Sequence, residues 1–254
     1  MEPHTSESAA PAPAAEEHSL SVWQRTVAVF VNPAKAWGGL NTRAQWWFPF
    51  VLMLVVSICF TLLLYHRAIL PMIQDSWDQA VADGKMTAEQ VDRASAFMGG
   101  PAGIGISLVQ TLIVLPIILM LTALAVWFAV AFLLGTKFSF RLALEAVCWS
   151  SLITIPGQLL TGFIAWSRET MKGVHVGFGA LLPVDDPPTK VQAALGFFLD
   201  RIGPLELWYL AVLILGAAAL SGAPRKRTMW AVGGAYMVIM LFIAVLTFIT
   251  TKGS

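Results

Sequence analysis

Long apolar stretches separated by polar links dominate this chain. Five of them are long enough to cross a bilayer, at residues 46–66, 103–135, 142–166, 205–222 and 229–250. An α-helix needs about 20 residues to cross the hydrocarbon core, and each backbone group left unpaired in lipid costs several kcal/mol. The pattern therefore predicts an all-α fold: a polytopic membrane helical bundle with five transmembrane helices, over residues 46–250.

The first 45 residues are predicted to lie outside the hydrocarbon. Residues 1–19 are rich in Ala, Pro and Glu, so we expect a disordered tail there. Over residues 20–31, helical spacing places four apolar side chains on one face: Trp23, Val27, Phe30 and Val31. Asn32 and Pro33 match the N-cap and first position of a second short helix over 33–40. Residues 20–45 are therefore expected to form short interfacial helices.

The links on the opposite side are longer. Between the first two stretches, Asp83 and Gly84 indicate a turn, and Thr87 with Gln90 matches a capping box that opens a helix through Phe97. This link predicts a helical hairpin. The link between the third and fourth stretches predicts an irregular loop, because it contains three prolines: Pro183, Pro187 and Pro188.

Basic residues are concentrated on one side of the predicted bundle. Residues 20–45 and two short links carry Lys and Arg without Asp or Glu: Arg25, Lys35, Arg43, Lys137, Arg141, Arg225, Lys226 and Arg227. The two longer links mix both signs. An excess of Lys and Arg in short links marks the cytoplasmic side. We therefore expect the N-terminus and the interfacial helices in the cytoplasm, and the C-terminus in the periplasm or outside the cell.

Composition supports a membrane protein and argues against several other classes. Hydrophobic residues make up 57% of the chain and charged residues 12%, whereas soluble domains carry about a quarter charged residues. A net charge of +1 gives no indication of nucleic-acid binding. Cys59 and Cys148 both fall inside apolar stretches, which favours buried thiols over a disulfide framework or a zinc site.

Five segments carry a resemblance to a known family. They are VFVNPAKAWGGL before the first stretch, the opening WWFP, the hairpin run GKMTAEQVDRA, GTKFSFRLALEAVCWSSLITIPG, and LELWYLAVLILGAAALSGAPRKRTMWAV. In their order and spacing, over residues 22–250, the chain resembles the Yip-one domain family, and within it the bacterial branch. The resemblance implies a five-span helical membrane fold with a cytoplasmic N-terminus. Eukaryotic members are associated with vesicle traffic, small GTPases and membrane shaping, whereas bacterial members largely lack an assigned function. A bacterial inner membrane is therefore the expected location.

Three charged residues are candidates for function. Arg141 and Glu145 are four residues apart and share a helix face, near the end of the third stretch. A buried pair can mark a transport path, but long side chains near a helix end also reach water, and we favour a local interfacial pair. Glu206 follows Pro204 in a first helical turn, where the helix dipole favours a carboxylate. Trp208 and Tyr209 beside it are typical of the aromatic belt.

Small residues recur every four positions into the second stretch: Gly99, Gly103, Ser107 and Thr111. Such a stripe permits close helix contact, and packing within one protomer is favoured over a dimer seam. Pro116 and Pro156 lie within apolar stretches, where they act either as hinges or as static kinks.

Known catalytic and metal-binding patterns are missing from the sequence. His66 and His175 stand apart from other ligand residues at the predicted outer edge. We find no nucleophile elbow, phosphate-binding loop or dinucleotide fingerprint. The sequence therefore predicts no catalytic, metal or cofactor site and no cofactor.

Two function hypotheses remain open. The favoured one is a non-enzymatic membrane organiser or scaffold, whose partners are the lipid bilayer and either other membrane proteins or further copies of this chain. The alternative is a small permease or an accessory subunit of a transporter, with Arg141, Glu145 and the two prolines along the path.

Overall fold

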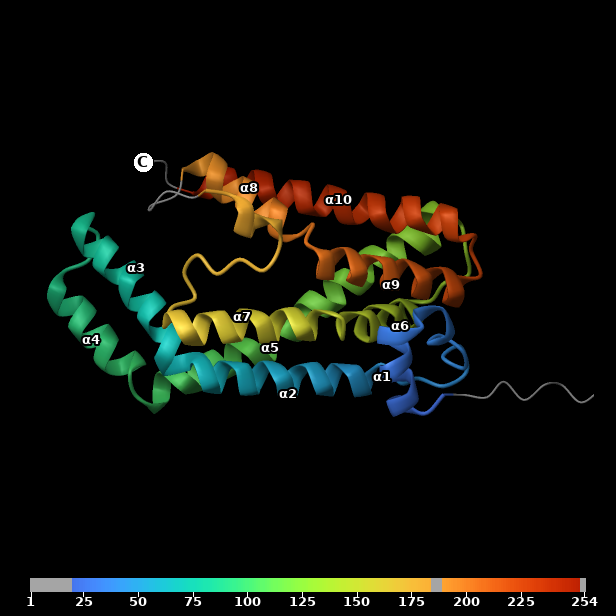
Figure 1. Cartoon of the computed structure of the whole chain (residues 1–254), viewed down its shortest axis with the longest axis horizontal. Coiled ribbons are helices and arrows are strands. Elements are labelled where there is room, and N and C mark those ends of the chain that lie inside the picture. Colours follow the sequence, from blue (N-terminus) through green and yellow to red (C-terminus); the bar gives the residue numbers. More distant parts are fainter. Residues whose placement is uncertain (1–19, 184–188, 252–254) are drawn as a thin grey trace, which may run out of the picture.

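The computed structural model describes residues 20–183 and 189–251, so the predicted tail over 1–19 lies outside the described residues. The secondary structure of the described part is helical throughout, and it forms one elongated bundle (Figure 1). The prediction of an all-α polytopic bundle is confirmed.

Four continuous helical segments are long and apolar enough to cross a membrane. They are α2 (Trp47–Leu64) with its extension α3 (Leu70–Ala82), α5 (Pro101–Trp127) with the π-helical turns Phe128–Leu133, α9 (Pro204–Ser221) and α10 (Arg225–Thr250). A fifth span results if α6 (Phe140–Ser151) and α7 (Thr154–Arg168), which meet at 41°, cross together.

The bundle has two different ends. At one end lie α1 (Val22–Val31) and the short links that join α5 to α6 and α9 to α10 (Figure 1). We call it the basic end, because the Lys- and Arg-bearing links predicted from the sequence meet there. At the opposite, hairpin end, α3 and α4 (Ala88–Met98) project beyond the bundle (Figure 1).

The hairpin forms as the sequence predicts. The Thr87 hydroxyl accepts a hydrogen bond from the backbone N–H of Gln90 at 3.2 Å, and the Gln90 side chain accepts one from the Thr87 N–H at 2.9 Å. This capping box satisfies two N–H groups that the start of α4 would otherwise leave unpaired. Gly84, with φ of +70°, allows the tight turn after α3.

Helix α6 forms the centre of the bundle. Nine of its residues are buried, among them Ala143, Ala146 and Trp149, and it packs against α2, α5 and α9. Small side chains permit these close approaches. Because α6 has so little lipid-facing surface, the side chains along it contact protein and can hold polar groups that lipid would exclude.

The predicted second interfacial helix over 33–40 is wrong in detail. Only a short 3-10 turn forms, Pro33–Lys35, and the Asn32 side chain makes no cap hydrogen bond. The segment after it is drawn inward instead, because Trp37 and Leu40 are buried in the core. A Cβ on Gly216 of α9 would lie only 2.5 Å from the Trp37 ring. The packing of the Trp37 indole therefore determines the course of the backbone here and outweighs the helix propensity of the segment.

The predicted irregular loop before α9 is also more ordered than expected. It contains a 3-10 turn, Phe178–Leu181, and a helix, α8 (Lys190–Asp200), whose N-terminus is capped by Thr189. Helix α8 packs beside α10 (Figure 1). Of the three prolines that suggested a loop, Pro187 and Pro188 lie outside the described residues.

Candidate functional site

Helix α1 presents the apolar face that its sequence predicts. Trp23 is 66% exposed and Val31 79% exposed, while Arg25 and Val29 on the other side of the helix are fully buried. The Trp23 ring packs edge-on against Phe48 of α2, with ring centroids 5.1 Å apart. The exposed face therefore lies next to the aromatic start of α2, where a membrane interface is expected.

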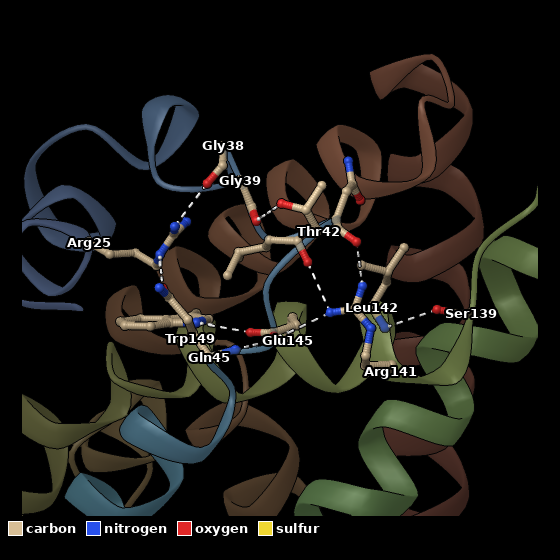
Figure 2. A network of polar contacts seen from close by, with 12 residues as sticks. Arg25, Gly38, Gly39, Thr42, Gln45, Ser139, Arg141, Leu142, Glu145 and Trp149 are labelled. Carbon is tan, nitrogen blue, oxygen red and sulfur yellow. Dashed lines mark hydrogen bonds and ion pairs between the residues drawn. The ribbon is translucent and has the colours of Figure 1, made fainter. Parts of the chain in front are cut away.

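Arg25, on the buried face of α1, anchors this helix to the rest of the bundle (Figure 2). Its guanidinium donates to the side-chain oxygen of Gln45 at 3.0 Å, to the carbonyl of Gly38 at 2.8 Å and to the carbonyl of Ala36. It also lies over the Trp149 ring, 5.6 Å from the centroid. Burial lowers the pKa of this guanidinium, and the nearby Glu145 carboxylate opposes that shift. A planar group with several donors suits this role better than lysine would.

Glu145 joins the N-terminal segment to α6. It is fully buried, and its two carboxylate oxygens accept hydrogen bonds from the backbone N–H of Gln45 at 2.7 Å and from the indole N–H of Trp149 at 3.2 Å (Figure 2). Its polar environment is therefore built from protein groups. This arrangement explains how a carboxylate is tolerated at this position.

The predicted local pair of Arg141 with Glu145 is weak. The closest nitrogen and oxygen are 3.8 Å apart, too far for a good hydrogen bond. Arg141 instead donates to the carbonyls of Leu40 at 3.0 Å and Asn41 at 2.7 Å. Both charges thus hold the same segment, residues 36–45, against α6 (Figure 2). We call Arg25, Gln45, Arg141, Glu145 and Trp149 the anchoring network.

The small-residue stripe of α5 contacts its own chain. The hydroxyls of Thr111 and Thr61 in α2 are 3.3 Å apart. A Cβ on Gly103 would lie 2.2 Å from the Tyr65 hydroxyl, which donates to the Met98 carbonyl at 2.7 Å. Gly103 and Thr111 therefore permit α2 and α5 to approach within one protomer. Ser107 lies between them on α5, and Gly99 belongs to the end of α4.

Glu206 lines a cavity inside the bundle. Two cavities, of about 520 and about 690 Å³, have several lining residues in common, including Gln158, Arg201 and Glu206. They adjoin, and we treat them as one, the mid-bundle cavity. Arg201 and Glu206 face each other across 3.9 Å between nitrogen and oxygen. Arg201 and Glu206 are thus two charges of opposite sign that lie near each other on the cavity wall.

Three contacts place this cavity half way along the bundle. Gln158 donates to the hydroxyl of Ser57, in the second half of α2, at 3.3 Å. Tyr236, near the middle of α10, donates to the carbonyl of Arg201 at 3.1 Å. A Cβ on Gly157 would lie 3.2 Å from Leu205. Helix α9 therefore begins inside the bundle and runs to the basic end, with α8 beside the other half of α10.

Two sequence expectations near this cavity are wrong. Tyr209 is buried and lines the cavity, so it is not an exposed belt residue. His175 does not stand alone, because its Nδ1 lies 2.6 Å from a carboxylate oxygen of Asp200. His175 and Asp200 therefore meet although they are 25 positions apart in the sequence.

Sequence reasoning missed Arg25, Gln45 and Arg201 as site residues. Arg25 is the polar residue on the face of α1 that Val22 and Val29 otherwise make apolar, a signal that could have been noticed. Arg201 is followed closely by Gly203 and Pro204, a break that exposes the start of α9. Gln45 carries no such signal, since it contacts Glu145 through its backbone.

No group of three or more His, Cys, Asp or Glu side chains within residues 20–183 and 189–251 could hold a metal ion. Cys148 is buried and Cys59 exposed, each as a free thiol.

The fold, with four or five helical segments long and apolar enough to cross a membrane, defines a polytopic integral membrane protein. A family model, described as the Yip1 domain, matches residues 27–247. The chain therefore belongs to the Yip1 domain family, as its sequence resemblance implied. No curated protein and no solved structure matches the chain.

Proposed function

We propose that this protein is a non-enzymatic membrane organiser that uses α1 as a fixed apolar wedge in one leaflet. The observation that carries the proposal is the contrast between the two faces of α1. One face is held by the buried Arg25, and the other leaves Trp23 and Val31 exposed. An amphipathic helix in the interface buries its apolar face into the boundary between headgroups and acyl chains.

Rigid attachment makes such a wedge effective. The anchoring network joins α1, the 36–45 segment and α6 through buried and partly buried hydrogen bonds. A helix held this way cannot tilt away to relieve the pressure it exerts on the lipid. The bilayer must therefore adjust to it, by local curvature or by recruiting suitable lipids and neighbouring membrane proteins.

Charge supports a cytoplasmic position for the wedge, in a bacterial inner membrane. Lys35, Arg43 and the run Arg225 to Arg227 are grouped at the basic end. Anionic lipids attract such residues by about 1 kcal/mol each. In this orientation the hairpin of α3 and α4 projects into the periplasm.

Curvature sorting tests the wedge. The full chain is reconstituted in giant vesicles that contain phosphatidylglycerol, and copies with an outward N-terminus are labelled with an impermeant dye. Wild-type protein is expected to be enriched in pulled membrane tubes relative to the flat vesicle. The triple variant Trp23→Ser, Val27→Ser, Val31→Ser should lose this enrichment, because it removes the buried volume in the leaflet.

The matched control is Phe97→Ser, at an exposed apolar position of α4 far from α1. It should sort as wild type does. Equal enrichment of the triple variant and the wild type would overturn the proposal.

The alternative function is a permease or a transporter subunit. The structure changes which residues are candidates for its path. Glu145 and Arg141 are engaged in the anchoring network, whereas Glu206 and Arg201 line the mid-bundle cavity. That cavity is the specific observation in favour of transport, since ionisable groups at such depth commonly mark a path. Solute flux into reconstituted vesicles that is lost in Glu206→Gln and kept in Glu145→Gln would favour this alternative.

A further inference from the structure

The mid-bundle cavity has two chemically different parts. Its charged part is formed by Arg201 and Glu206 at the start of α9. Its apolar part is a wall along α5 and α10 that includes Ile118, Leu121 and Ile239, all of them exposed. An apolar wall open to the membrane is filled by hydrocarbon. The cavity therefore combines a surface for acyl chains with a polar site half way along the bundle.

The charged pair is incompletely satisfied. Arg201 and Glu206 are 3.9 Å apart, with side chains 47% and 26% exposed. The distance is too long for a good hydrogen bond, so both groups retain capacity for another partner. The Arg201 guanidinium also lies over the Phe197 ring, 5.5 Å from its centroid, which fixes its position. Charges at membrane depth are costly unless they are paired.

We propose that this cavity binds a zwitterionic phospholipid with a primary amine in its headgroup. The phosphate accepts hydrogen bonds from the Arg201 guanidinium, for which it is a well-matched partner. The ammonium donates to the Glu206 carboxylate. The acyl chains lie along the wall of α5 and α10.

The chemistry of the site distinguishes this headgroup from others. A choline headgroup carries the same charges, but its quaternary amine has no N–H to donate to Glu206. An anionic headgroup such as phosphatidylglycerol places only negative charge and hydroxyls beside a carboxylate. Asp200, the other carboxylate of the cavity wall, is engaged by His175 through one oxygen, and its second oxygen is buried away from the cavity surface. The ammonium is therefore directed to Glu206.

Lipid retention tests this proposal. The purified full chain is incubated in mixed micelles with equal amounts of phosphatidylethanolamine, phosphatidylcholine and phosphatidylglycerol, and the lipid that remains after washing is quantified by mass spectrometry. A charge-assisted hydrogen bond corresponds to about tenfold in affinity. We therefore expect wild-type protein to retain phosphatidylethanolamine about tenfold over phosphatidylcholine.

Two variants separate the two contacts. Glu206→Gln should abolish the preference for ethanolamine over choline while lipid is still retained. Arg201→Gln should lower retention of both lipids together. The control pair Glu89→Gln and Arg93→Gln alters an exposed ion pair of the same residue types in the hairpin and should leave the ratio unchanged. Because the ratio is measured on one sample, a smaller amount of folded protein lowers both lipids together, and a melting temperature equal to that of the wild type shows that each variant is folded.

Three outcomes would overturn the proposal. The first is equal retention of the ethanolamine and choline lipids by wild-type protein, which indicates simple filling by hydrocarbon. The second is a preference that survives Glu206→Gln. The third is full displacement of the lipid by soluble glycerophosphoethanolamine at comparable concentration, which indicates a water-soluble ligand.

Discussion

At the scale of single residues, buried charged side chains attach the N-terminal segment to α6. Glu145 lies in the most protected part of the bundle, yet both of its oxygens are engaged by N–H groups. Leaving such a partner unsatisfied costs more than the hydrogen bond itself contributes. The contribution of Glu145 to stability therefore depends on its two acceptor oxygens. A substitution that keeps the size of the side chain but removes one acceptor tests this contribution.

Glu145→Gln should destabilise the protein. A glutamine amide presents one oxygen and one NH₂ group, so it can accept from Gln45 or from Trp149 but not from both. The NH₂ then faces another donor. We expect the free energy of unfolding in detergent to fall by about 1–3 kcal/mol. Glu89→Gln, in the exposed hairpin, should change it by less than about 0.5 kcal/mol, and equal stability of both variants would contradict the role of Glu145.

At the scale of elements, two helices are held by features that are easily altered. Helix α1 depends on the forked donors of Arg25. The start of α5 depends on the missing side chain of Gly103, which lets it approach Met98 of α4 and Tyr65, the residue after α2. Each therefore gives a prediction that concerns the placement of a helix.

Arg25→Lys should release α1. A lysine ammonium cannot reach the Gln45, Ala36 and Gly38 acceptors together, because it lacks the planar fork. Val29 is fully buried beneath the helix. In a background with Cys59→Ala and Cys148→Ala, Val29→Cys should react with maleimide much faster when Arg25→Lys is added. Val31→Cys, already exposed, should react equally in both, and unchanged protection of Val29→Cys would show that Arg25 is not the anchor.

Gly103→Ala should disturb the junction of α2, α4 and α5. The added Cβ would meet the Met98 carbonyl at 2.1 Å and the Tyr65 hydroxyl at 2.2 Å, and overpacking of this kind costs about 1–3 kcal/mol. Gly105→Ala is the matched control, because its Cβ meets nothing within 4 Å and alanine favours the helix. We expect a lower melting temperature for the first variant and an equal or higher one for the second.

At the scale of the whole molecule, the two ends of the bundle are chemically distinct. The basic end holds α1 and two short links, and the hairpin end holds α3 and α4 (Figure 1). From the positive-inside rule we expect the basic end to face the cytoplasm. This expectation rests on the distribution of charge, and it also places the proposed wedge, α1, on the cytoplasmic side.

Cysteine accessibility tests the orientation in intact cells. With the native cysteines replaced, Glu89→Cys in α4 should react with an impermeant reagent from outside the inner membrane. Arg227→Cys, at the basic end, should react only after the membrane is permeabilised. Reaction of both from the same side would contradict the assignment.

The sequence by itself determined the helical class, the approximate spans, the capped hairpin, the apolar face of α1 and the family. These are local properties, since hydropathy and caps act over a few neighbouring residues. Only the tertiary structure decided what Glu145 contacts, because its partner Gln45 is 100 positions away. It also decided that α9 begins half way along the bundle and that Arg201 and Glu206 share a cavity, because both depend on how separate helices pack.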